Sequence, residues 1–358
     1  MAAQTSTNTT LSPIIVREVS PAVLRRWREF IQAAGRRRVA SQPEWLVVLR
    51  DALGHQPFVL EARDTSGRLV GLLPLARVRS KLFGDALVSL PFVSIGGAVA
   101  SEPAVGAKLV DAAVELADAL GVDHLQLRHQ EPLEHSALHA ARTDKVMMRR
   151  PLPDSTEELW KSVGPKVRNQ VRKGQKAGLR VEWGREELVD EFYRVFARNM
   201  RDLGTPVYPK ALFAAMLEAF GERCEVCVVR GEGGQPYAAA VLVHGEGSTE
   251  VPCASSLREY NSTCANMLMY WHLLERAIER GQGEFEFGRS TEGSGPYRFK
   301  KQWGGRPSRL HWQYYVRRGD PTAVRPDDER YAWKVRMWRK LPLWLANTLG
   351  PRIARGIP

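Results

Sequence analysis

Two clusters of basic side chains have the residue types and spacing that suit chemistry on anionic groups. In the first cluster, Arg168 and Arg172 are one helical turn apart, which suits binding of a phosphate or pyrophosphate. A solvated helix surface is the alternative, and we favour it for Lys173, Lys176 and Arg180. In the second cluster, a fixed cation would stabilise the negative charge that develops on a carbonyl oxygen during acyl transfer. The clusters comprise Lys161, Lys166, Arg168, Arg172, Lys173, Lys176 and Arg180, and then Arg289, Arg298, Lys300, Lys301 and Arg306.

A helix and a short strand must position the second cluster. Apolar residues recur at helical spacing over 267–278, and two glycines follow them. Glutamate and phenylalanine then alternate over 284–287, as in a half-buried strand. We expect residues 288–291 to leave this strand as a polar loop, which is where α/β sheets usually bind ligands.

Comparable patterns recur along the whole chain. Both halves show helices, a strand meander and a closing helix–strand pair, which indicates a diverged duplication with an α/β (α+β) fold. The expected helices are 24–31, 45–53, 109–120, 186–203 and 210–220, and the expected strands are 58–62, 69–75, 124–127, 224–229, 237–243 and 248–253. The expected divisions are a disordered stretch 1–11, one domain over 12–150, a second over 151–318 and a basic, tryptophan-rich helical tail over 319–358.

A series of short motifs resembles the FemAB-like branch of the GNAT acyltransferase superfamily. The signature runs Tyr260-Asn261, Ala265-Asn266, Phe285-Glu286-Phe287-Gly288 and Tyr297-Arg298-Phe299-Lys300-Lys301-Gln302-Trp303-Gly304. Further matches include Lys81-Leu82-Phe83-Gly84, Ser89-Leu90-Pro91-Phe92, Lys166-Val167-Arg168-Asn169 and Pro206-Val207-Tyr208. Together they look most like FemAB-type proteins associated with PEP-CTERM/exosortase systems.

The resemblance implies two tandem GNAT-like domains with mixed sheets and a catalytic centre at Lys300. Lys300 matches the lysine to which the family assigns oxyanion stabilisation, and Phe299 would exclude water and orient it. Lys301 is the expected plain surface lysine beside it. By the same resemblance, the substrate-binding residues are Lys166, Arg168, Tyr208, Tyr260, Asn261, Asn266, Arg289, Ser290, Thr291, Tyr297, Arg298 and Trp303, with Asn266 alternatively a helix cap.

The implied reaction transfers an acyl or aminoacyl group from a carrier-linked donor to an amine-type acceptor, in exopolysaccharide or cell-envelope biosynthesis. The donor is a co-substrate of the acyl-CoA, acyl-carrier-protein or aminoacyl-tRNA type, with no bound cofactor. Acetyl-CoA members of the superfamily bind pyrophosphate through a glycine-containing loop, but residues 258–266 contain no glycine. The alternative is a non-catalytic protein that holds tRNA or a nucleotide-linked glycan in the same basic cleft.

A general base has two candidates, Glu250 and Glu286. Either would take the proton of an attacking amine. A carboxylate that alternates with phenylalanines also fits a solvent-facing position. A third reading needs no protein base, because the amine can lose its proton to substrate or water.

Composition limits the remaining possibilities. The net charge of +12 over 358 residues favours an anionic partner. Cys224 and Cys227 form C-x-x-C within an expected strand, so their thiols should face opposite sides, and no histidine cluster accompanies them to suggest a metal. The tail mixes tryptophan with Lys and Arg, which suits peripheral membrane contact, although packing across both domains is equally compatible. We expect a cytoplasmic protein, at the inner membrane face if the tail binds lipid.

Overall fold

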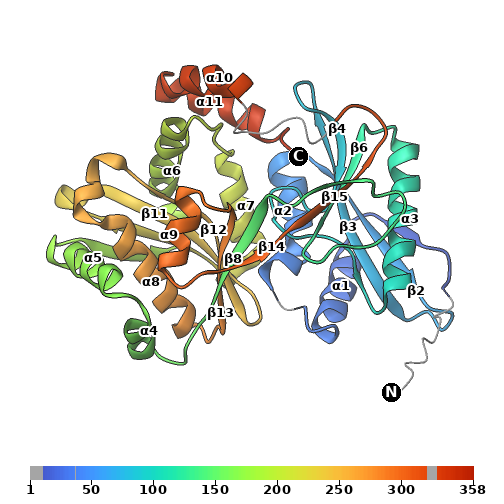
Figure 1. The fold of residues 1–358 in the computed structure, drawn as a ribbon, viewed down its shortest axis with the longest axis horizontal. Coiled ribbons are helices and arrows are strands. Elements are labelled where there is room, and N and C mark those ends of the chain that lie inside the picture. Colours follow the sequence, from blue (N-terminus) through green and yellow to red (C-terminus); the bar gives the residue numbers. More distant parts are fainter. Residues whose placement is uncertain (1–10, 37, 321–328) are drawn as a thin grey trace.

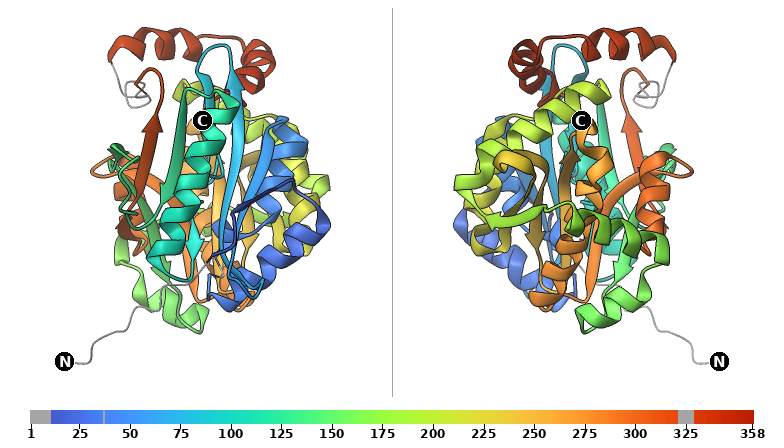
Figure 2. Two further views of the ribbon diagram at one scale, coloured as in Figure 1. Left: turned by 90° about the vertical axis from the view of Figure 1, so that its right-hand side faces the viewer. Right: turned by 90° about the vertical axis from the view of Figure 1, so that its left-hand side faces the viewer.

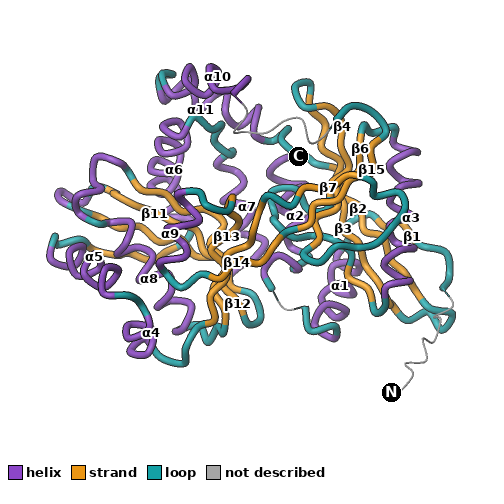
Figure 3. Tube along the Cα trace, in the orientation of Figure 1, coloured by secondary structure: helices purple, strands orange, loops and turns teal. Residues whose placement is uncertain are grey.

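The computed structural model describes residues 11–36, 38–320 and 329–358, with side chains from residue 332 onward in the last range. The expected disorder of the first eleven residues falls almost wholly outside these ranges. The chain forms two α/β halves that lie side by side, each built on a mixed sheet with helices around it (Figure 1, Figure 3). A pair of helices at the C-terminus lies across one end of the molecule (Figure 2).

The first sheet has the order β1-β2-β3-β4-β6-β15-β7, with β5 paired to β3. Its helices begin and end at sequence signals that favour them. Ser20 caps α1 by accepting a hydrogen bond from the amide of Val23, and Gly121 ends α3 in the left-handed conformation. The elements are β1 (Ile15–Arg17), α1 (Pro21–Ala33), α2 (Glu44–Leu53), β2 (Gln56–Arg63), β3 (Leu69–Ser80), β4 (Gly84–Val88), β5 (Val99–Ala100), α3 (Pro103–Leu120), β6 (His124–His129) and β7 (Ala140–Arg142).

The second sheet has the order β14-β8-β13-β12-β11-β10-β9. Ser155 caps α4 by accepting a hydrogen bond from the amide of Glu158. The elements are β8 (Lys145–Pro151), α4 (Thr156–Ser162), α5 (Pro165–Lys176), β9 (Arg180–Gly184), α6 (Val189–Leu203), α7 (Lys210–Phe220), β10 (Cys224–Arg230), β11 (Pro236–His244), β12 (Ser248–Ser256), α8 (Ala265–Glu279), β13 (Glu284–Thr291), α9 (Gly295–Gln302), β14 (Arg306–Arg309) and β15 (His311–Val316). The tail forms α10 (Glu329–Arg339) and α11 (Leu343–Ala354).

The two halves exchange strands. β8 lies almost wholly in the expected first domain but pairs with β13 and β14 of the second sheet. β15 lies in the expected second domain but pairs with β6 and β7 of the first sheet. The expected boundary at residue 150 therefore does not separate the two sheets. Because each sheet contains a strand from the other half, the two halves are joined by backbone hydrogen bonds as well as by side-chain packing.

A hydrophobic core runs between the halves. Helices α1 and α2 of the first half pack with α6 and α7 of the second, and the Trp45 and Phe220 rings meet at 5.1 Å between centroids. A separate core lies on the other face of the second sheet, under α4, α5 and α8. Cys224 belongs to the first of these cores and Cys227 to the second, which confirms the opposite orientation of the two free thiols.

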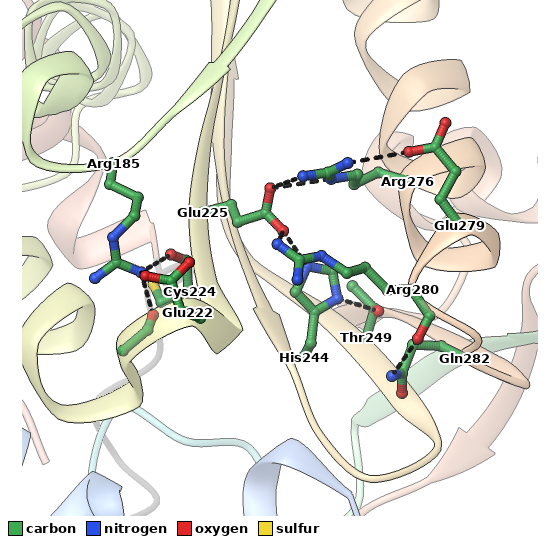
Figure 4. A network of polar contacts seen from close by, with 11 residues as sticks. Arg185, Glu222, Cys224, Glu225, His244, Thr249, Arg276, Glu279, Arg280 and Gln282 are labelled. Carbon is green, nitrogen blue, oxygen red and sulfur yellow. Dashed lines mark hydrogen bonds and ion pairs between the residues drawn. The ribbon is translucent and has the colours of Figure 1, made fainter.

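A polar network centred on Glu225 fastens the end of α8 to the second sheet (Figure 4). Arg276 donates to Glu225 Oε2 at 2.6 Å, and Arg280 and His244 bind Oε1. Burial alone would raise the pKa of Glu225, but these hydrogen bonds and charges lower it to about 2. His244 also bonds Thr249 at 2.8 Å, so it has a structural place at the end of β11.

The expectation of a polar loop at residues 288–291 is wrong. These residues continue β13 to Thr291 and pair with β8 after a register shift between Glu286 and Arg289. Gly288 makes the shift possible because its φ of +76° is accessible to glycine at little cost. The loop that follows spans only residues 292–294, since α9 begins at Gly295.

Candidate active site

The parallel strands β12 and β13 separate in the middle of the second sheet. Their register pairs Ser248 with Glu284, Thr249 with Phe285 and Glu250 with Glu286, and it stops there although both strands continue. A bulge near Val251 on β12 and the shift at Gly288 on β13 coincide with the separation. The sheet is therefore split between the C-terminal ends of β12 and β13. Backbone groups on both strands are left there for a ligand to pair with.

Lys300 reaches into this split from α9. Its Nζ donates to the carbonyl oxygens of Gly288 at 3.1 Å and Arg289 at 2.9 Å. An ammonium has three N–H donors, so these bonds leave one for a ligand. Burial, and then the charge of Arg289, lowers the pKa of Lys300 to about 8. Phe299 packs edge-on against Tyr270 at 4.8 Å and fixes α9 beside the split.

Glu250 lies on β12 at the point where the strands separate. It is 6% exposed, and its Oε2 has no hydrogen-bond partner among the described residues. Burial raises the pKa of Glu250 to about 8, with a further contribution from the charge of Glu286, while Arg149 and Lys300 oppose the rise. A buried, unpaired carboxyl group of this kind can accept a proton near neutral pH.

Glu286 is held differently. It is fully buried, accepts from Arg149 Nε at 2.8 Å and from Ser248 Oγ at 3.0 Å. The alternative that these two glutamates face solvent is therefore wrong, because the first half of the molecule covers this face of the sheet. Of the two base candidates, Glu250 has the free oxygen.

Other predicted contacts lie close to the same split. Arg289 stacks over Trp312 at 5.1 Å, and the charge of Arg289 also acts on the phenol of Tyr208. Tyr208 packs edge-on against Phe92 of the first half at 5.2 Å. Ser290 is buried, and its hydroxyl has no hydrogen-bond partner within the described part of the chain. The structure thus brings Arg289 and Tyr208 to one side of the site, whereas Ser290, the next residue of β13, faces the other side of the sheet.

The remaining residues of the 289–303 segment have structural partners. Thr291 accepts from Lys145 at 2.6 Å, and Arg298 donates to the carbonyl of Gly293. Tyr297 is buried in the core that α8 covers. Trp303 is fully buried in the same core, and Arg150 binds its carbonyl oxygen. The prediction of Trp303 as a ligand contact is not supported, because packing under α8 accounts for its position.

Tyr260, Asn261 and Asn266 lie where β12 leads into α8. Tyr260 is stacked on Tyr237 with ring centroids 3.5 Å apart, and Asn261 is exposed. Asn266 lies inside α8, whose N-cap is Cys264, so the helix-cap alternative for Asn266 is wrong. Cys264 has φ +60°, a left-handed conformation that glycine adopts most readily, and no side chain of the described residues caps the helix. The start of α8 therefore keeps amide groups without a side-chain cap, and such groups suit an anionic group of a donor.

Lys166 and Arg168 lie apart from these residues, at the start of α5. Lys166 is exposed. Arg168 donates to the carbonyl oxygens of Trp160 and Val163 at the end of α4, at 3.3 and 2.6 Å. This bonding gives Arg168 a helix-capping role, which accounts for its place in the motif without a ligand.

Sequence reasoning missed three residues of this region, Arg128, Arg149 and Trp312. Arg128 is buried, stacks over Trp312 at 4.3 Å and donates to the carbonyl of Val93 at 2.7 Å. Burial lowers the pKa of Arg128 to about 9. The local signal for Arg128 was weak, because polar residues alternate with Leu125 and Leu127 in this strand and Arg128 falls at a polar position. No local signal existed for Trp312, because its contact depends on the exchange of β15.

A cavity of about 630 Å³ opens between the halves, on the other side of Glu286 from Lys300. Its lining includes Arg38, Gln130, Ser248 and Glu284. Arg149 connects it to the split, because this side chain bonds both Gln130 and Glu286. The cavity and Lys300 are therefore joined by buried polar groups rather than by one continuous pocket. Among the described residues, no group of three or more His, Cys, Asp or Glu side chains is placed to hold a metal.

Comparison with known proteins agrees with this geometry. Residues 162–301 match the family described as an acetyltransferase (GNAT) domain. This range contains β12, α8, β13 and Lys300. No curated protein matches the chain in sequence.

Solved structures show the same fold over most of the chain. The crystal structure of FemX superimposes with a TM-score of 0.65 and 14% identity, over 85% of this chain and 97% of that one. A tandem GNAT protein from the clavulanic acid biosynthesis pathway gives 0.56 and 14%, over 86% and 100%. L-PGS from Bacillus licheniformis gives 0.53 and 13%, over 91% and 99%. The fold is thus confirmed as two GNAT-like units in tandem, and the mixed sheets with flanking helices are as expected.

Proposed function

We propose that the protein transfers an acyl or aminoacyl group from a carrier-linked donor to an amine-type acceptor. The observation that carries the proposal is the presence of both Lys300 and Glu250 at the split between β12 and β13, each within reach of the other's charge. A cation with one free donor and a buried carboxyl group with one free oxygen are the two groups that amine acylation requires.

The two residues have separate roles in the proposed reaction. The amine nitrogen attacks the donor carbonyl carbon, and the remaining N–H of Lys300 stabilises the oxyanion of the tetrahedral intermediate. Glu250 accepts the proton that the amine loses. The bond from the carbonyl carbon to the carrier then breaks, the carrier leaves with a proton, and an amide remains. The reaction as written conserves atoms and charge without a metal ion or a redox partner.

The donor in this proposal belongs to one of three classes. Acyl-CoA, acyl-carrier protein and aminoacyl-tRNA all present an activated carbonyl next to an anionic carrier. The uncapped start of α8 and the basic surface of the chain suit such a carrier. The motif resemblance supports a small-molecule or glycan-linked acceptor in exopolysaccharide or cell-envelope biosynthesis.

Native mass spectrometry of the purified full chain with each donor in turn tests the proposal. We expect one donor class to be retained and its acyl group to pass to an added amine acceptor. A protein that retains no donor but keeps tRNA or a nucleotide-linked glycan without turnover would be a binding protein, and the proposal would be overturned.

A further inference from the structure

Exposed apolar side chains gather at one end of the molecule. Among the described residues, the large exposed hydrophobics are Val16, Leu82, Leu203, Trp333, Met337, Trp344, Leu349 and Ile357. All except Val16 lie on α10, on α11, at the chain end or on segments that touch these parts. Figure 2 shows α10 and α11 along this end, with the β3–β4 hairpin reaching the same level. Such clustering marks an interaction surface, whereas single scattered apolar residues do not.

The C-terminal helices are held firmly to the body on their inner sides. Val335 of α10 packs against Gly204, where an added Cβ would come within 2.5 Å of it. Gly350 of α11 packs as closely against Val207. Near the hairpin, Gly356 lies against Ser80, and His55 bonds the carbonyl of Arg355 at 2.8 Å. The outer sides are consequently presented in a fixed arrangement.

Large apolar residues are exposed on those outer sides. Trp333 and Met337 are one turn apart on α10, and each is 57% exposed. On α11 Trp344 is 69% exposed, and Leu349 follows it. Leu82 adds an exposed apolar side chain at the hairpin tip. We call this set, with the basic residues around it, the C-terminal face.

The described side chains of the C-terminal face carry only positive charge. Residues 332–358 include no aspartate or glutamate, but they contain Lys334, Arg336, Arg339, Lys340, Arg352 and Arg355. All six of these side chains are exposed, as is Lys81 in the hairpin. Tryptophan favours the headgroup level of a bilayer, and each Lys or Arg near an anionic bilayer surface strengthens binding. No helix among the described residues is long and apolar enough to cross a membrane.

We propose that the C-terminal face docks the protein on an anionic lipid bilayer. The helices lie flat on the surface, with Trp333 and Trp344 at headgroup depth and the basic residues against lipid phosphates. Three segments far apart in the sequence contribute to this face, so docking fixes the orientation of the whole molecule. The inference does not depend on the proposed reaction.

One consequence does rest on the proposed function. The C-terminal face lies close to Tyr208, one of the predicted substrate-binding residues, because Gly350 packs against its neighbour Val207. His55 forms a second connection, since it packs at 6.0 Å on Phe92, which in turn touches Tyr208. An acceptor carried on a lipid would then reach the site from the membrane side.

Vesicle flotation of the full chain tests the docking. Phosphatidylcholine vesicles with and without phosphatidylglycerol serve as probes, at low and high salt. We expect binding only to the vesicles that contain phosphatidylglycerol, and weakening by salt. The double variants Trp333→Ala with Trp344→Ala and Lys340→Glu with Arg352→Glu should each reduce binding about tenfold or more.

A matched control reverses charges elsewhere. Lys173→Glu with Lys176→Glu changes the net charge equally on the exposed side of α5, and we expect it to retain most of the binding. All variants replace exposed side chains, so their melting temperatures should stay near that of the parent. Equal loss in the α5 variant, or equal binding to both kinds of vesicle, would overturn the inference. Light scattering that shows a dimer dissociated by the tryptophan variants would assign the face to a second copy of the chain instead.

Discussion

Glu250 and Lys300 act on each other's charge across the split between β12 and β13. The ammonium of Lys300 limits the rise in the pKa of Glu250, and the carboxylate of Glu250 limits the fall in the pKa of Lys300. Burial drives both shifts, so the two groups lose and gain protons in the same range, near pH 8. The proposed reaction should therefore depend on the charge of both groups in the same pH range.

Replacing Lys300 should abolish turnover while donor binding remains. Lys300→Met keeps the length of the side chain but removes the donor to the oxyanion, and we expect kcat to fall about a hundredfold or more. Lys301→Met is the control, because Lys301 is exposed and points to the ring of Tyr297 at 5.9 Å. Steady-state kinetics and donor titration check the prediction. Equal losses in the two variants would exclude Lys300 as the oxyanion donor.

The pH dependence of the reaction should be a narrow bell. On the acidic side, the rate rises with pH because Glu250, with its raised pKa of about 8, must lose its proton to act as a base. On the alkaline side, the rate falls because Lys300, with its lowered pKa of about 8, loses its charge. A profile of kcat/KM between pH 5 and about 10 measures both limbs. A flat profile above pH 6 would show that Glu250 is not the base.

Glu250→Gln should make the protein more stable and less active. A carboxyl group whose folded pKa is raised above its unfolded value, normally about 4.3, destabilises the fold increasingly as pH rises between those two values. The amide removes this cost, so the free energy of unfolding at pH 7 should increase by about 1 to 3 kcal/mol. Urea denaturation at pH 5 and pH 8 measures the difference, which should be larger at pH 8. A less stable variant at both pH values would show that Gln cannot replace the protonated acid.

The sequence predicted the helices and strands around Lys300 better than the contacts between distant segments. Helical and alternating periodicities placed the helices and strands around Lys300, because each element has one face in a core. The burial of Glu286 was hidden by the same periodicity, since alternation with Phe285 and Phe287 distinguishes two faces of a strand but not what covers the second face. Here the other half of the molecule covers it.

The sequence did not predict the strand pairing and helix contacts that depend on distant segments. The continuation of β13 past Gly288 depends on pairing with β8, a strand about 140 residues earlier in the chain. Similarly, Arg168 could be placed on a helix, but its bond to the end of α4 needs the angle between two helices. Such non-local contacts leave no periodic signal in the sequence.

The Glu225 network should contribute to stability at neutral pH. Because the folded pKa of Glu225 is about 2, its contribution is fully present above its unfolded pKa and is lost as pH falls through about 2. We expect Glu225→Gln to lower the free energy of unfolding at pH 7 by about 2 to 4 kcal/mol. Glu279→Gln, at the exposed partner of the same Arg276, should cost less than about 1 kcal/mol. Chemical denaturation of both variants at pH 7 tests this order, and a similar cost for both would contradict it.

Gly288 offers a test of the split itself. Gly288→Ala places a methyl group at a φ of +76°, which costs about 1 kcal/mol of stability, and the methyl would lie 3.9 Å from both Lys300 Nζ and the carbonyl of Val251. The methyl group fits without a clash, but it occupies the space between β12 and β13 into which we expect the donor to bind. We therefore expect a lower affinity for the donor, with only a small loss of stability.

Gly281→Ala separates these two effects. Gly281 has a similar φ of +69° at the end of α8, but an added Cβ there has no neighbour within 4 Å. Both variants should lose about 1 kcal/mol of stability, whereas only Gly288→Ala should raise KM for the donor, because only its methyl group enters the split. Calorimetry and donor titration on the two proteins measure these quantities. If donor affinity is unchanged in Gly288→Ala, then the donor does not enter between β12 and β13, and the position of the reaction relative to Lys300 must be different.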